Sequence, residues 1–251
     1  MIKVKKSIDT LPNILKEKST QSKHKRLLTA QKWLSSSSYK SPYQNKKLKE
    51  SLKSIYNHKC AYCEQKMVFP KKNQNKSASN DLTLEHYRPK STYYWLAYSW
   101  DNLLPVCYDC NHAKEDFFDI EGVEITEIRT NEIDNIHELA SIYNSEEKPK
   151  FIHPELENLS TEFIFGKDGT VTSNNERCQY VIEKCDLKRL KLVLKRRKII
   201  DDLKSKYQAI QTEEEFYQLA KDIKTKSINP KTEFIALYDF ILANFNTIIT
   251  G

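Results

Sequence analysis

The sequence predicts an α+β protein that is predominantly helical, with a small metal-holding centre in its first half. Glycine and proline, which sheet-rich folds need at their many turns, number only 4 and 8 among 251 residues. Two short runs near residues 82–87 and 103–107 have the character of strands. Two C-x2-C pairs accompany these runs: one precedes the first run, and the other begins at the end of the second.

We expect four regions along the chain, each with its own composition. They are a basic helical N-terminal region (1–56), a core that carries both C-x2-C pairs (57–120), an acidic segment with a β-hairpin (121–174) and a C-terminal helical region (175–251).

The charge is unevenly distributed around a net value of +7. Basic residues outnumber acidic ones by 15 to 3 in residues 1–59 and by 10 to 3 in residues 184–206, whereas acids dominate residues 115–160 by 13 to 3. Two basic segments around the core favour a polyanionic partner such as nucleic acid. The alternative is that these charges simply solvate helix surfaces.

The sequence shows no pattern typical of a membrane span or of a secretory signal. No run approaches the roughly 18 apolar residues of a membrane span, and the start MIKVKKSIDT has no apolar stretch of the secretory kind. We therefore expect a cytoplasmic protein, in which paired cysteines indicate metal binding rather than disulfides.

The N-terminal region should contain a short helix opened by Pro12, a helix over about 23–34 and a helix over about 44–56. The serine-rich stretch SSSSYKSPY between the last two is typical of a linker. The polar residues 71–80 predict a loop. LTLEHY then alternates as a strand that Pro89 ends, LLPVC is a second strand, and DCNHAK begins a helix.

The second half should begin with a hairpin whose turn includes Gly166 and Gly169. Helices are then expected over about 175–184, 187–211, 213–225 and 230–245. Thr212 and Glu215 form a capping box for the third of these helices, and Asn229 before Pro230 predicts the start of the fourth.

The two C-x2-C pairs predict a closed zinc site. The four ligands would be Cys60, Cys63, Cys107 and Cys110. Four thiolates satisfy tetrahedral Zn²⁺ without an open position, so the ion should be structural rather than catalytic. Buried free thiols are the alternative. Cys178 and Cys185 lie on one face of a predicted helix, where we expect them to be small core residues.

The order of residues in this core carries a resemblance. C-x2-C, then Glu85–His86 at a strand end, then Asn102, then C-x2-C-N-x2-K, resembles the HNH endonuclease family of ββα-metal fold. With the flanking segments EHYRPK, YSWDNLLPVC and IHPEL, it is similar to the HNH subunits of Septu-type anti-phage systems and of some retron modules. The resemblance implies an endonuclease that acts with a PtuA-like ATPase subunit.

The chemistry of these residues agrees with phosphodiester cleavage. His86 has an ordinary pKa that lets it accept a proton at neutral pH. Glu85 and Asn111 offer the hard oxygens that suit a catalytic Mg²⁺ or Mn²⁺, which would stabilise the leaving oxygen. By resemblance, Asn102 fixes the loop that orients His86.

Three basic residues are candidates for contacts with phosphate. Lys114 follows Asn111 by three positions on the same helix face, and Arg88 and Lys90 are weaker candidates.

One geometric condition applies to the site. An ideal strand sends Glu85 and His86 to opposite faces, so both reach one ion only if the strand ends or distorts there.

The remaining histidines have less specific surroundings. We expect His112 to face solvent, with a phosphate contact as the alternative, and His153 to be a turn residue before a proline, with bracing of the site as the alternative. His24, His58 and His137 are assigned no chemistry.

Two functions other than a self-sufficient nuclease remain open. One is a non-catalytic zinc module that binds nucleic acid, which would explain the cysteines and the basic segments but not Glu85, His86, Asn102 and Asn111. The other is an adaptor subunit whose nuclease acts only inside a complex. The nucleic acid could be DNA or RNA, because no recognition helix is evident.

Overall fold

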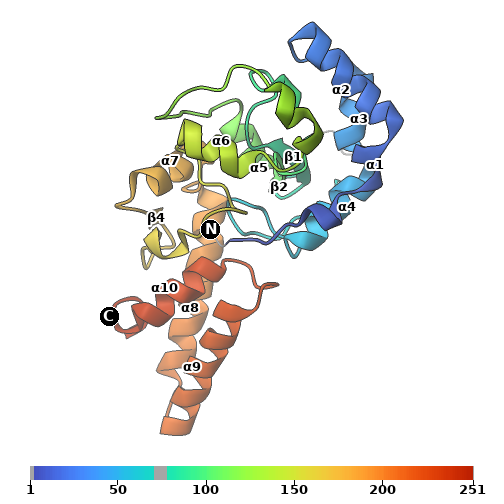
Figure 1. Ribbon diagram of the computed structural model, residues 1–251. Coiled ribbons are helices and arrows are strands. Elements are labelled where there is room, and N and C mark those ends of the chain that lie inside the picture. The colour runs from blue at the N-terminus through green and yellow to red at the C-terminus, as the bar shows by residue number, and fades with distance from the viewer. Residues whose placement is uncertain (1–2, 71–77, 251) are drawn as a thin grey trace.

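A computed structural model describes residues 3–70 and 78–250 (Figure 1). The prediction of a predominantly helical α+β fold is confirmed. Helices form both ends of the chain, and the strands are short and confined to the middle. The predicted loop over 71–80 lies mostly outside the described residues.

A ββα unit stands at the centre of the first half. Strand β1 (Leu82–His86) pairs antiparallel with β2 (Leu103–Cys107), in a register that sets His86 opposite Leu103 and Leu82 opposite Cys107. Helix α5 (Tyr108–Lys114) follows β2 directly and packs against both strands. Every residue of β2 is buried, which fits an apolar run covered on both faces.

The N-terminal region contains one helix more than predicted. Its helices are α1 (Asn13–Lys16), α2 (Lys18–Ala30), α3 (Ser37–Gln44) and α4 (Lys46–Ile55). The expectation of a linker at SSSSYKSPY was wrong, because α3 occupies it. Pro42 cannot donate to the carbonyl of Ser38, but the hydroxyl of Ser41 donates to that carbonyl at 2.8 Å instead. The rings of Tyr39 and Tyr43, one turn apart, both pack on Trp33.

The rest of the chain consists of helices and one small hairpin. The elements are α6 (Ala140–Glu147), the hairpin β3 (Ile164–Phe165) and β4 (Val171–Thr172), α7 (Glu176–Lys184), α8 (Leu190–Gln208), α9 (Glu213–Ile228), α10 (Ile235–Ala243) and a closing π-helical turn (Asn246–Thr250). Short 3₁₀ turns occur at Ile8–Thr10, Tyr94–Leu96, Thr130–Asn135 and Ser160–Glu162. In Figure 1, α8 and α9 run side by side and extend away from the ββα unit.

The capping predictions for the last two long helices had different outcomes. Thr212 and Glu215 form the predicted capping box of α9. The predicted start at Asn229–Pro230 was wrong, since α10 begins at Ile235. A carboxylate from the first cysteine turn caps it there: the backbone N–H of Ala236 donates to Glu64 Oε2 at 3.1 Å. A cap contributed from 172 positions away leaves no local sequence signal.

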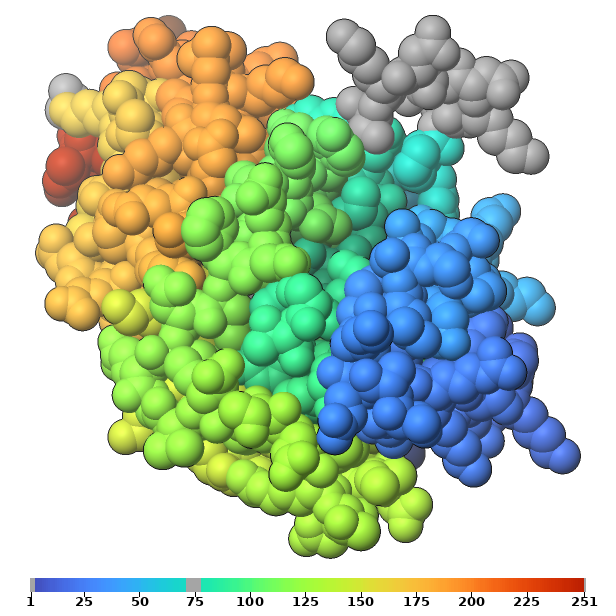
Figure 2. Space-filling view, turned by 90° about the horizontal axis from the view of Figure 1, so that it is seen from above, coloured from blue at the N-terminus to red at the C-terminus, as the bar shows by residue number. Residues whose placement is uncertain are grey.

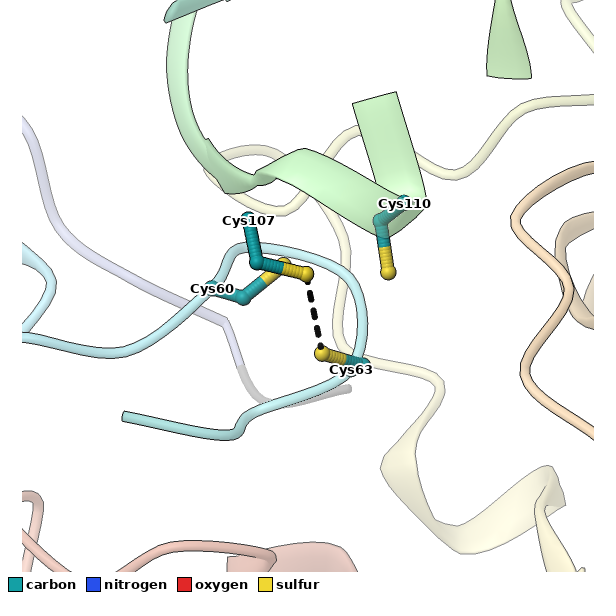
Figure 3. A group of neighbouring side chains, drawn as sticks. All are labelled: Cys60, Cys63, Cys107 and Cys110. Atoms are coloured by element: carbon teal, nitrogen blue, oxygen red, sulfur yellow. Dashed lines mark hydrogen bonds between the residues drawn. The ribbon is translucent and has the colours of Figure 1, made fainter. Parts of the chain in front are cut away.

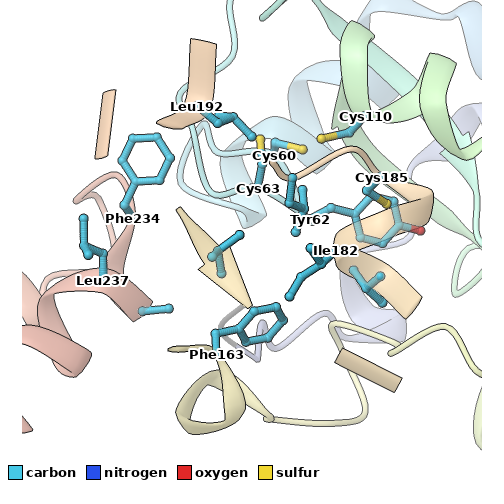
Figure 4. Packing of buried hydrophobic residues seen from close by; sticks show 14 of the residues in the cluster. Cys60, Tyr62, Cys63, Cys110, Phe163, Ile182, Cys185, Leu192, Phe234 and Leu237 are labelled. Atoms are coloured by element: carbon cyan, nitrogen blue, oxygen red, sulfur yellow. The ribbon is translucent and has the colours of Figure 1, made fainter. Parts of the chain in front are cut away.

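Two apolar clusters hold these parts together. The first joins the cysteine turns and the ββα unit to the β3–β4 hairpin and to α7, α8 and α10 (Figure 4). The second joins the N-terminal helices to the aromatic segment that follows β1, including Trp95 and Trp100. Figure 2 shows the N-terminal region pressed against the central part of the chain. Among the described residues, no helix combines the length and apolar character that crossing a bilayer requires.

Candidate active site and metal centre

The two C-x2-C turns meet at the end of β2. Cys107 is the last residue of that strand and Cys110 lies in the first turn of α5. The first turn is tied to the strand by the backbone N–H of Ala61, which donates to the carbonyl of Pro105 at 3.0 Å. All four sulfurs, those of Cys60 and Cys63 included, lie within 4.8 Å of one another and are buried (Figure 3).

The spacing of these sulfurs fits a tetrahedral metal ion. Zn–S bonds of about 2.3 Å imply sulfur–sulfur separations of about 3.8 Å, and Cys63 Sγ and Cys107 Sγ are 3.7 Å apart. Burial raises the pKa of the Cys63 and Cys110 thiols, whereas thiol donors from the neighbouring cysteines lower the pKa of Cys107. The cluster can therefore hold a metal ion, as its sequence predicted. Cys178 and Cys185 are buried elsewhere in the core.

The inner face of β1 brings Glu85 and Asn111 together with Lys114. The amide nitrogen of Asn111 donates to Thr83 Oγ1 at 2.8 Å and to the carbonyl of Leu84 at 3.2 Å, so these contacts leave its amide oxygen to other partners. Lys114 Nζ lies 2.5 Å from Glu85 Oε1. Thr83 and Glu85 alternate onto the same side of the strand, the side that α5 covers.

His86 lies at the last position of β1 and turns away from α5. Its Nε2 is 3.0 Å from the carbonyl of Ala97, which can only accept, so Nε2 carries the proton and Nδ1 keeps its lone pair. The ring of Tyr43, from α3, meets the imidazole edge-on at a centroid distance of 5.1 Å. Burial, reinforced by the charge of Lys90, lowers the pKa of His86 to about 3. His86 is therefore a neutral imidazole that can accept a proton at Nδ1.

The strand does not distort to bring Glu85 and His86 to one face. Regular pairing continues to the end, with Glu85 opposite Leu104 and His86 opposite Leu103. The two side chains nevertheless share the end of the strand, where they occupy its last two positions. Burial raises the pKa of Glu85, although the charge of Lys114 opposes this effect.

Asn102 fastens the loop that follows His86. Its Oδ1 accepts from the backbone N–H of Arg88 at 2.7 Å, while its Nδ2 donates to the carbonyls of Arg88 at 3.1 Å and Leu96 at 3.2 Å. Leu96 precedes Ala97, whose carbonyl receives the imidazole proton of His86. One side chain thus joins both ends of the loop.

The three basic candidates for phosphate contact differ in their surroundings. Arg88 is buried, and its guanidinium donates to Glu147 at 2.7 Å and to Asn144 at 2.8 Å, so its position does not support the predicted phosphate contact. Lys114 is fully buried beside Glu85. Lys90 is half-buried, with its ammonium 5.9 Å from the ring of Trp33. Of the three candidates, Lys90 is therefore the most accessible to a phosphate.

Removing the partner of Arg88 should strongly destabilise the protein. In Glu147→Leu, we expect the free energy of unfolding to fall by about 3–5 kcal/mol, because a buried guanidinium loses its counter-charge. Urea denaturation measures the change. Glu146→Gln is the matched control, since the neighbouring Glu146 pairs at the surface with Arg129, and we expect its effect on stability to be far smaller. Equal losses in the two variants would contradict the structural role given to Arg88.

The remaining histidines have structural surroundings. His112 is exposed and stacks on Tyr108. His153 is fully buried: its Nδ1 accepts from the backbone N–H of Glu155 at 3.3 Å, and its Nε2 donates to the carbonyl of Asp101 at 3.1 Å. Both nitrogens are thus used, and burial lowers the pKa of His153 to about 3. His153 fixes the loop before β2 rather than offering a free base.

Neutral His153 should make the protein sensitive to acid. The unfolded chain takes up a proton near pH 6.5, whereas the folded state does not until about pH 3. Its contribution to stability is therefore complete above pH 6.5 and is lost as the pH falls through that window, by about 2 kcal/mol between pH 7 and pH 5. Urea denaturation at both values should show His153→Gln losing about 2 kcal/mol less than wild type. An unchanged pH dependence would show that His153 is not held neutral.

Several residues around the site left no signal in the sequence. Tyr43 lies in a segment predicted as a linker, and Ala97 contributes only a backbone carbonyl. Arg189 lies 79 positions beyond Cys110, yet its Nη2 is 3.3 Å from that sulfur. Thr83 could have been found, because it precedes Glu85 by two positions on the same strand.

Comparison with known proteins shows what this chain is similar to. Residues 60–117 match the family model described as HNH endonuclease. The chain is 28% identical over 219 residues to the Septu protein PtuB of Bacillus mycoides, which covers 79% of this chain and 68% of that protein. A second Septu protein PtuB, from Bacillus thuringiensis, is 37% identical over 67 residues, covering 27% of this chain and 23% of that protein.

A third match is to a much longer protein. The Septu protein PtuA of Bacillus mycoides is 23% identical over 214 residues, which is 79% of this chain but only 27% of that protein. Residues 60–117, which hold the ββα unit, the Glu85–His86 strand end and the four-cysteine cluster, therefore resemble an HNH endonuclease domain, and the chain as a whole is similar to the Septu PtuB proteins.

Proposed function

We propose that this protein is a divalent-metal-dependent endonuclease that cleaves the phosphodiester bonds of nucleic acid. The observation that carries the proposal is the arrangement at the end of β1. Glu85 and Asn111 lie on the side covered by α5, and His86 presents an unprotonated Nδ1 at the same strand end. Oxygen ligands for a divalent ion and a neutral imidazole at one strand end are groups that can support attack by water on a phosphate.

Glu85 and Asn111 would hold Mg²⁺ or Mn²⁺ through one carboxylate oxygen and the amide oxygen. Both are hard donors of the kind these ions prefer. The amide nitrogen of Asn111 is already used by Thr83 and Leu84, which orients its oxygen as the ligand atom. When bound, the ion supplies positive charge beside the scissile phosphate and its leaving oxygen.

His86 would act as the general base. Its Nε2–H is anchored on Ala97, so Nδ1 takes the proton from the attacking water, and the loop tied by Asn102 sets the direction of the ring. The bound phosphate would offset the low pKa, because an anion beside the ring stabilises the imidazolium that forms. Lys90 would contact the phosphate, and Lys114, which pairs with Glu85 in the structure, would release this carboxylate to the ion.

The four cysteines would hold a structural Zn²⁺. Four thiolates leave no position for water or substrate, so this ion stabilises the fold and takes no part in cleavage. The ligands come from the first cysteine turn, from the end of β2 and from α5. The ion would therefore connect the ββα unit to the first cysteine turn, which precedes it in the chain.

We further propose that the nuclease belongs to a Septu-type anti-phage system and acts with a PtuA-like ATPase subunit. The likeness to the Septu PtuB proteins supports this, as does the occurrence of a related segment within a longer PtuA protein. The contacts of the site favour activation inside a complex. His86 is covered by Tyr43, and Glu85 is bound to Lys114, so both must be freed for a substrate and an ion to reach them.

A cleavage assay tests the proposal. Labelled DNA and RNA, single- and double-stranded, are incubated with the protein, alone and with its ATPase partner, in Mg²⁺ or Mn²⁺ and in EDTA. We expect cleavage with the divalent ion and none in EDTA, with the highest rate when the partner is present. Binding without cleavage under every condition would instead support a non-catalytic zinc module.

A further inference from the structure

Arg189 touches the four-cysteine cluster from outside the HNH segment. It directly precedes α8, and its Nη2 lies 3.3 Å from Cys110 Sγ, 3.6 Å from Cys107 Sγ and 3.7 Å from Cys63 Sγ. We propose that Arg189 is a functional part of the metal centre: it donates hydrogen bonds to the metal-bound thiolates, balances their charge and thereby sets how tightly the ion is held. This inference rests on the proposed zinc site.

Contacts on the other nitrogens of the guanidinium direct Nη2 toward the sulfurs. Nη1 donates to the carbonyls of Cys185 at 3.1 Å and Asp186 at 2.9 Å, at the C-terminal end of α7, and Nε lies 3.4 Å from Asp109 Oδ2. With Nη1 hydrogen-bonded to two carbonyls and Nε within ion-pair distance of Asp109, Nη2 is directed at the sulfurs. The side chain is only 10% exposed, so water screens the contact weakly.

The charge of the cluster gives Arg189 its effect. Four thiolates around Zn²⁺ carry a net charge of −2, and a buried charge is costly unless it is paired and hydrogen-bonded. A guanidinium is always protonated and offers N–H donors in a fixed plane, so it suits this position better than an ammonium. Its hydrogen bonds draw electron density from the sulfurs, as groups around metal ligands generally tune metal affinity.

Neighbouring contacts clamp the first cysteine turn onto the same C-terminal region. Glu64 caps α10 through Ala236, and Lys195 of α8 donates to Gln65 Oε1 at 3.1 Å. Leu192 of α8 lies beside Cys60 and Cys63 in the apolar cluster (Figure 4). Arg189 therefore makes the affinity for the ion depend on the docking of helices that the HNH motif does not include.

The alternative is that Arg189 only caps α7, through the carbonyls of Cys185 and Asp186, and that its approach to the sulfurs has no consequence. A cap would affect the melting temperature without changing the bonding between sulfur and metal. The two possibilities are separated by measurements on the metal itself.

The experiment compares full-length wild type, Arg189→Gln, Arg189→Lys and the control Arg197→Gln, whose exposed guanidinium pairs with Asp201 on α8. Zinc content is determined first, followed by the rate of zinc transfer to a chromogenic chelator, zinc affinity by competition, and the sulfur-to-metal charge-transfer bands after Co²⁺ substitution. In Arg189→Gln we expect an affinity about 10–100-fold lower, faster transfer, and bands moved to longer wavelength.

The other two variants sharpen the test. Arg189→Lys keeps the charge but not the planar fork, so we expect an intermediate affinity and bands between those of wild type and Arg189→Gln. Arg197→Gln should match wild type. A folded Arg189→Gln with wild-type affinity and spectrum would overturn the inference, and if that variant does not fold, a folded Arg189→Lys identical to wild type would do the same. A wild-type protein without zinc would instead refute the proposed zinc site.

Discussion

Removing one ligand of the four-cysteine cluster should unfold the protein. We expect Cys60→Ser to contain no zinc and to lose the cooperative thermal transition of wild type, and treatment of wild type with a strong chelator should have the same effect. Structural zinc sites contribute on the order of 10–16 kcal/mol, which equals or exceeds the roughly 5–15 kcal/mol by which a whole domain is stable. The rest of the fold cannot compensate for a loss of that size.

Cys178→Ser is the matched control for that variant. Cys178 is as buried as the four ligands but lies outside their cluster, so the same substitution there should leave the zinc content at its wild-type value. Zinc analysis and far-UV circular dichroism report both outcomes. A metal-free Cys60→Ser protein with the wild-type fold and melting temperature would contradict a structural role for the cluster.

Replacing His86 should slow cleavage by orders of magnitude while leaving the fold and the zinc content intact. We expect His86→Gln to cleave about 10²–10⁴-fold more slowly than wild type, the range that general acid–base catalysis contributes. Glutamine is preferable to alanine because its amide can still donate to the carbonyl of Ala97, whereas alanine would leave a cavity beneath Tyr43 and an unpaired buried carbonyl.

His112→Gln is the control, because His112 is exposed on α5 one position from Asn111. It should cleave at the wild-type rate. Initial rates for the three proteins, measured with the ATPase partner present, decide the matter. A His86→Gln enzyme that retains cleavage would show that another group removes the proton from water.

Local patterns in the sequence predicted the central unit well. The alternation of LTLEH, the apolar run LLPVC and the helix after the second cysteine pair all form as expected, because each is short and its neighbours are contiguous in the chain. The cysteine spacing predicted the cluster for a similar reason. Each C-x2-C turn brings two sulfurs together locally, and the pairing of β1 with β2 helps to bring the two turns into contact.

Features that depend on distant contacts were not predictable. Serines and a proline at 35–43 indicated a linker, but packing of two tyrosines on Trp33 overrides that tendency. The start of α10 depends on Glu64, and the burial of Arg88 depends on Glu147, which lies 59 positions away. No residue-level pattern encodes such partners, since they meet only when the chain is folded.

The position of the catalytic candidates divides in the same way. The sequence predicted their residue types and their order in the chain, but it did not predict which side of β1 each of them occupies. The sequence left open whether β1 would distort so that Glu85 and His86 could share an ion. The regular pairing to Leu103 and Leu104 places Glu85 on the side of β1 that α5 covers and His86 on the other side, and the proposed roles of ion ligand and general base follow this division.

The measurement that tests this division most directly is a Mn²⁺ titration of the cleavage rate for wild type, Asn111→Ala and His86→Gln. Loss of an ion ligand should raise the Mn²⁺ concentration needed for half-maximal cleavage, so Asn111→Ala should recover activity at high Mn²⁺. Loss of the base should lower the maximal rate without shifting that concentration, so His86→Gln should recover none. Recovery of His86→Gln by Mn²⁺, or identical titration curves for the two variants, would contradict the separate roles of Asn111 and His86.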